Sequence, residues 1–254
     1  MKEKSFLIPS LLILLFSIVI VATFGIIPLP EYSADSNLNL GGVIFYSTEI
    51  QSVNIIPPAP DIVDQCIFKV DISKKEITEK KVVCTSDLYQ YSYEIYLNDI
   101  EMDKNENLIL RYWNNSLNSE MALILDSDKS EISLINMDDV SMNKSMYEIN
   151  ALGEKLLTPW EMREMDTRTV GVYYQKNSEI IEVFKTVAPT NYFFESLVWS
   201  TDGMNIVGLD TENDLIIFSK DKIFNPIRLT LKNSAVSEFE DDEVVINQII
   251  GWSN

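Results

Sequence analysis

Two patterns of hydrophobic residues divide the chain. Residues 6–29 are almost all apolar, and no charged residue lies between Lys4 and Glu31. A helix of this length, at about 1.5 Å per residue, spans roughly 36 Å and would cross the ~30 Å hydrocarbon core of a bilayer with some tilt. Beyond residue 40, short runs of β-branched and aromatic residues alternate with Asp, Asn, Ser, Lys and Gly. This second pattern is typical of strands joined by turns.

The first pattern predicts a membrane anchor. We expect a cytoplasmic stub at residues 1–5, a transmembrane helix at 6–29, a tether at 30–40 and an extracytoplasmic domain at 41–254. Lys2 and Lys4 precede the apolar run and Glu31 and Asp35 follow it, so the positive-inside bias places the N-terminus in the cytoplasm. A secreted protein with a cleaved signal peptide is the alternative. It fits less well, because the run exceeds a 7–15-residue apolar core and has no A-x-A exit.

The second pattern predicts an all-β domain of antiparallel strands. Repeated helices of 10–15 residues, which parallel βαβ units need, are absent, and we expect a single helix within residues 138–157. The predicted strands are residues 43–46, 66–72, 108–112, 122–125, 170–174, 180–184, 206–209, 215–218 and 244–250.

One unit, residues 199–230, carries a motif. A turn with glycine follows a tryptophan, and an aspartate leads into a second apolar strand; the motif residues are Trp199, Ser200, Asp202, Gly203 and Asp214. The unit resembles the blade of TolB-type β-propellers, a WD-repeat-like blade, with Thr201 in place of the family's proline. This resemblance implies a propeller-like domain that binds partners through a propeller face.

The rest of the chain repeats this unit in outline only. The aligned strands that begin at Val43, Leu108, Val170 and Ile206 are unevenly spaced, whereas a propeller has a nearly fixed period. A two-sheet β-sandwich is therefore the alternative architecture. The last residues, 251–254, resemble another blade-start strand, which would close the ring against the first strands.

Charge and composition exclude several kinds of chemistry. The chain has 20 basic and 39 acidic residues, a formal net charge of −19 and no histidine. The absence of histidine removes Ser-His-Asp triads, Cys-His dyads and imidazole metal sites. The negative charge argues against nucleic acid as a partner. We expect no enzyme, although a hydrolase that cleaves glycans with two carboxylates is an alternative.

Few side chains are candidates for a specific bond or site. Cys66 and Cys84 fall nearly opposite each other across a predicted hairpin, so we expect a disulfide outside the cytoplasm. We expect no metal and no cofactor. The acidic groups at 126–128, 138–139 and 238–243 lack the glycine and glutamate of a calcium loop and are interpreted as solvated turns. Tyr89, Tyr91 and Tyr93 would share one strand face, as core residues or as a platform for a sugar or peptide.

These observations predict a membrane-anchored, extracytoplasmic binding or scaffold module. Its partners would be the membrane, through residues 6–29, and a protein, peptide or glycan at a propeller face. A structural subunit of a larger membrane assembly is a further alternative.

Overall fold

The computed structural model describes the chain in twelve stretches: 40–52, 62–73, 77–89, 100–103, 107–114, 117–126, 131–136, 149–157, 169–187, 192–223, 225–229 and 242–253. The predicted anchor at 6–29 and nearly all of the tether lie outside these residues. Within the described stretches, no helix has the length and apolar character that crossing a bilayer requires.

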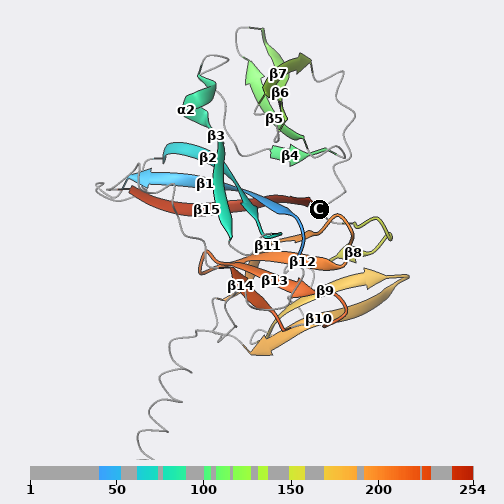
Figure 1. Ribbon diagram of the computed structural model, residues 1–254. Helices are drawn as coiled ribbons and strands as arrows, with labels where there is room; N and C mark the ends of the chain where they lie inside the picture. Colours follow the sequence, from blue (N-terminus) through green and yellow to red (C-terminus); the bar gives the residue numbers. More distant parts are fainter. Residues whose placement is uncertain are drawn as a thin grey trace, which may run out of the picture.

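The fold is all-β, as predicted. The described strands form four antiparallel sheets, and a single four-residue helix, α2 (Thr85–Leu88), accompanies them in the part of the chain that is described. The two-sheet sandwich does not describe this arrangement, because the strands divide among four sheets (Figure 1).

The first sheet joins the two ends of the described chain. Its strand order is β15 (Asp242–Ser253), β1 (Val43–Ser52), β2 (Ile62–Asp71) and β3 (Thr78–Cys84). The C-terminal strand β15 pairs with β1 along its full length. The expected pairing of the last residues with the first strands is therefore confirmed.

The second sheet is a consecutive meander. It consists of β4 (Ile100–Met102), β5 (Leu108–Asn114), β6 (Ser119–Asp126) and β7 (Glu131–Asn136), paired in chain order. Each strand turns back on the one before it, so the sheet forms from neighbouring segments of sequence.

The third sheet has three described strands. The short β8 (Lys155–Leu156) and the long β10 (Glu179–Val187) pair with opposite sides of β9 (Thr169–Lys176). Asn177 and Ser178 connect β9 to β10 and both have positive φ, 48° and 70°. Two such residues in a row are what a tight hairpin turn requires.

The fourth sheet contains the motif unit. It consists of β11 (Phe194–Trp199), β12 (Asn205–Asp210), β13 (Leu215–Ser219) and β14 (Ile227–Leu229), again in chain order. The buried residues are continuous from 206 to 210 and from 215 to 219, so β12 and β13 are covered on both faces.

The prediction of a helix within residues 138–157 is wrong for residues 149–157, the part of that segment that the structure describes. Residues 149–157 form an isolated bridge, a turn and β8, while 138–148 lie outside the described residues. The Asn150 side chain accepts the backbone N–H groups of Leu152 and Glu154, each at 3.0 Å, and Gly153 has a φ of +75°. These local bonds stabilise a turn in competition with a helix.

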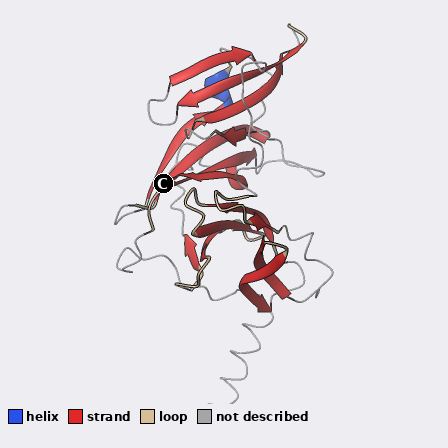
Figure 2. Ribbon diagram, turned by 90° about the vertical axis from the view of Figure 1, so that its right-hand side faces the viewer, coloured by secondary structure: helices blue, strands red, loops and turns tan. Residues whose placement is uncertain are grey.

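Hydrophobic clusters join the sheets in a row. One lies between the first and fourth sheets and contains Ile44 and Ile217, a second joins the first sheet to the second through Ile67 and Leu108, and a third joins the third sheet to the fourth. Figure 1 shows the resulting order of second, first, fourth and third sheet, and Figure 2 shows the succession from the side. Among the described residues, no cluster joins the second sheet to the third.

Candidate functional site

Four of the motif residues, Trp199, Ser200, Asp202 and Gly203, form the hairpin turn between β11 and β12. Trp199 ends β11, is 2% exposed, and meets the Tyr174 ring edge-on at 5.6 Å. The Ser200 hydroxyl lies 2.6 Å from the Asp202 carboxylate and accepts the backbone N–H of Asn205 at 2.9 Å. The motif therefore fixes a turn over a buried aromatic pair.

Gly203 lets this turn approach a second one. It has a φ of +68°, which favours glycine, and a Cβ there would lie 2.8 Å from Nδ2 of Asn150. Thr201 reaches the other way and donates a hydrogen bond to the carbonyl oxygen of Trp252 at 3.2 Å. The turn thus contacts the loop before β8 and the end of β15.

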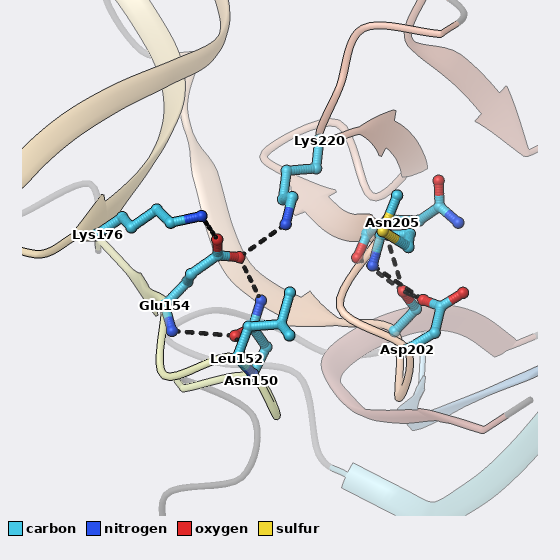
Figure 3. Close-up of polar contacts among 9 residues, drawn as sticks. Asn150, Leu152, Glu154, Lys176, Asp202, Asn205 and Lys220 are labelled. Atoms are coloured by element: carbon cyan, nitrogen blue, oxygen red, sulfur yellow. Dashed lines mark hydrogen bonds and ion pairs between the residues drawn. The ribbon is translucent and has the colours of Figure 1, made fainter.

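A buried carboxylate, Glu154, connects these turns. Its side chain is fully buried, with Lys220 Nζ 2.8 Å from Oε2 and Lys176 Nζ 3.0 Å from Oε1. The Asn150 amide donates to Oε2 at 2.8 Å. Figure 3 shows how Glu154 lies among these three donors, beside the Asp202–Asn205 turn.

Glu154 is held in its charged form. Burial by itself raises its pKa, but the hydrogen bonds from Lys220, Asn150 and Lys176 outweigh that effect and lower the pKa from 4.5 to about 2. A carboxylate that stays ionised over the whole physiological range and already accepts three donors does not serve as a general acid. Its role is to hold the turns in place.

We call the surface built by these turns the turn face. It comprises the turns at residues 150–153, 177–178, 200–204 and 220–223, which come from the third and fourth sheets. Leu152, in the first of these turns, is 61% exposed, and Ile223, in the last of them, is 74% exposed. The turn face therefore combines a fixed backbone with exposed apolar side chains.

Asp214 belongs to a second polar cluster, at the turn between β12 and β13. Its backbone N–H and that of Glu212 each donate to Oδ1 of Asp210 at 2.9 Å. Tyr192 donates its hydroxyl proton to Oδ2 of Asp210 at 2.7 Å, and burial together with this bond raises the pKa of Tyr192. Asp210, 1% exposed, is thus a turn-closing residue.

This second cluster brings three carboxylates together at one turn. One oxygen each of Asp210, Glu212 and Asp214 lies within 4.8 Å of the others. Arg228 lies 3.1 Å from Asp214 and 3.5 Å from Glu212, so the chain itself supplies the compensating positive charge. Burial and the neighbouring Asp210 raise the pKa of Glu212, which Arg228 partly offsets.

The predicted cysteine pair is a disulfide in the structure. Cys66 on β2 lies directly opposite Cys84 at the end of β3, with Cα atoms 4.0 Å apart. Asp64 also lies near these sulfurs. Because disulfide sulfurs are not thiolates, the three residues do not fit a zinc site.

The other candidates fall partly outside the described residues. Tyr89 follows α2 and is 44% exposed, while Tyr91 and Tyr93 lie outside the description. Asp103 closes the turn between β4 and β5 by accepting the backbone N–H of Asn107 at 2.9 Å. Of the acidic groups, 127–128, 138–139 and 238–241 are likewise outside, whereas Asp126 ends β6.

Comparison with known proteins gives little. No family model matches the chain, and no curated protein sequence matches it. Among solved structures, the chain is similar to TolB from Acinetobacter baumannii at a TM-score of 0.25 and 11% sequence identity, in an alignment that covers 84% of this chain and 68% of that one.

Proposed function

We propose that this protein is a membrane-tethered, propeller-like binding or scaffold module that holds a protein or peptide against the turn face. Residues 6–29 provide the membrane anchor in this proposal, and the sheet domain projects outside the cytoplasm. The proposal assigns the chain a binding role and no catalytic one.

The observation that carries the proposal is the convergence of turns around Glu154. Turns of the third and fourth sheets are joined there by one buried ionic group, so their exposed residues keep fixed relative positions. A preorganised surface loses little entropy on binding. Leu152 and Ile223 supply the apolar contact that a protein or peptide partner would cover.

The propeller-like part of the proposal is supported by strand order. The second and fourth sheets are four-stranded meanders, and the last strand, β15, completes the first sheet beside β1. In proteins built from radially repeated sheets, pairing of the last strand with the first strand in one sheet protects the sheet edges.

Site-specific photocross-linking of the full chain in its native cells tests the binding role. A photoreactive amino acid at Leu152 or at Ile223 should give the same discrete adduct with a second protein. The matched control is Leu117, a leucine 64% exposed on the β5–β6 turn of the second sheet, which should give none. Absence of an adduct at both turn-face positions, or the same adduct at Leu117, would refute the proposal.

A further inference from the structure

Strand β10 is an outer strand of the third sheet. Eight of its nine residues, all but Val183, pair with β9 on one side, and the described residues place no strand on its other side. The other three sheets each have four strands.

The register with β9 shows which β10 side chains face away from the core. Ile181 lies opposite Tyr174 and Phe184 lies opposite Val172, and all four belong to or pack on the core of the third and fourth sheets. An irregularity between residues 182 and 184 shifts the alternation by one position. The outward residues are therefore Ile180, Glu182, Lys185 and Val187.

We propose that β10 binds β10 of a second copy of this chain, as an antiparallel strand pair with its dyad between Val183 and Phe184. In this register Glu182 lies opposite Lys185 of the second copy, and Ile180 lies opposite Val187. Each pair occurs twice by symmetry. Opposite charges and paired aliphatic side chains directly across an antiparallel ladder are stabilising.

The exposure of the outward β10 residues is consistent with binding of β10 from a second copy. Ile180 is 50% exposed and Val187 is 75% exposed, so both have apolar surface to cover. The side chain of Glu182 is 46% exposed and lies 3.9 Å from Lys222 in a distant ion pair. The irregularity at residues 182–184 sits at the dyad, where each copy carries it, so it creates no mismatch between them.

Two other outer strands, β3 and β14, lack this self-complementarity. In β3 the neighbouring Lys80 and Lys81 are both exposed, so a second copy would bring lysines together. Strand β14 has three residues and offers a short ladder. Short length prevents edge pairing, and β10, with nine residues, is not short.

Charge reversal tests the register. The mass of the full chain in detergent, measured by light scattering over a concentration series, should be that of a dimer for the natural protein. Glu182→Lys or Lys185→Glu should shift dissociation to at least tenfold higher concentration, because each places like charges opposite each other. The double variant Glu182→Lys with Lys185→Glu should restore the dimer. Glu120→Lys, at an exposed position on β6, is the control and should change nothing.

Cysteine cross-linking supplies a readout that other contacts between copies would not produce. A mixture of Glu182→Cys and Lys185→Cys chains should form a mixed disulfide, because directly opposite Cα atoms are about 5 Å apart. Glu182→Cys alone should not cross-link to itself, since its two copies would lie three residues apart along the strands. Three results would each overturn the proposal: a natural protein that is monomeric, single charge variants that dimerise normally, and Glu182→Cys chains that cross-link alone as efficiently as the mixture does.

Discussion

At the scale of single residues, Glu154 has the largest expected effect on stability. Removing its charge leaves Lys220, whose side chain is 7% exposed, as a buried cation without its anion. Loss of one partner of a buried ion pair costs about 3 kcal/mol or more. We therefore expect Glu154→Gln to lower the free energy of unfolding by about 3 kcal/mol, measured by urea denaturation at neutral pH.

An exposed glutamate provides the matched control. Glu120 lies at an exposed position on β6, so Glu120→Gln should change the free energy of unfolding by less than about 0.5 kcal/mol. Equal effects of the two substitutions would contradict the structural role assigned to Glu154.

The same residue predicts a dependence on pH. The folded-state pKa of Glu154 lies near 2, below the ordinary value of 4.5, so its ionised form stabilises the fold. That contribution is fully present above pH 4.5 and is lost as the pH falls towards 2. The stability difference between the natural protein and Glu154→Gln should therefore shrink through this range, followed by urea titrations at stepwise lower pH. A difference that stays constant would show that the charge of Glu154 is not its source.

Sequence reasoning recognised local residue patterns and missed distant ones. The Trp199–Gly203 turn could be recognised because its hydrogen bonds join residues close in sequence. Glu154 could not, because Lys220 is 66 residues away and only the fold brings the two together. Nothing in the sequence distinguishes Glu154 from the other 38 acidic residues of the 39.

At the scale of elements, the backbone just before β1 lies close against the end of β15. Gly42 has a φ of +108°, and a Cβ there would lie 2.0 Å from the Ser253 carbonyl oxygen and 2.7 Å from Nε1 of Trp252. Gly42→Ala must strain this backbone or separate the two strands. We expect a loss of about 2 kcal/mol or more in the free energy of unfolding, measured by urea denaturation, and faster hydrogen exchange in β15.

The preceding residue is its control. A Cβ on Gly41 would meet no heavy atom within 4 Å, so Gly41→Ala should stay within about 0.5 kcal/mol of the natural protein. If Gly42→Ala matched Gly41→Ala in stability and in exchange, the pairing of the chain ends would not be as the structure shows it.

Element prediction succeeded where strands are apolar runs and failed where they are short or polar. The runs at 206–209 and 215–218 became the buried strands β12 and β13. The short β4 and β8 were not predicted, because two or three residues carry no periodicity. The expected helix at 138–157 failed at its end because Asn150 and Gly153 build a turn there.

At the scale of the whole molecule, two separate features concern its location. The apolar run at 6–29 predicts a membrane anchor, and the Cys66–Cys84 disulfide links β2 to β3 in the domain that would project outside. Disulfides persist in oxidising compartments and are rare in the cytosol. The two features are independent, since one depends on lipid and the other on redox potential, and both support the proposal that the sheet domain lies outside the cytoplasm.

This location can be measured on the full chain in intact cells. We expect the protein to remain with the membrane fraction after an alkaline wash, and we expect Cys66 and Cys84 to resist alkylation unless a reductant is added first.

Replacing Leu14 and Ile18, in the middle of the apolar run, with arginine should release the protein from the membrane, because each charge at the bilayer centre costs about 3 kcal/mol. Leucine-to-alanine changes at Leu12 and Leu15 are the control and should leave it bound. A natural protein found in the soluble cytosol with both thiols reactive would contradict the anchor and the outward placement together, whereas a soluble protein with the disulfide intact would indicate secretion after cleavage.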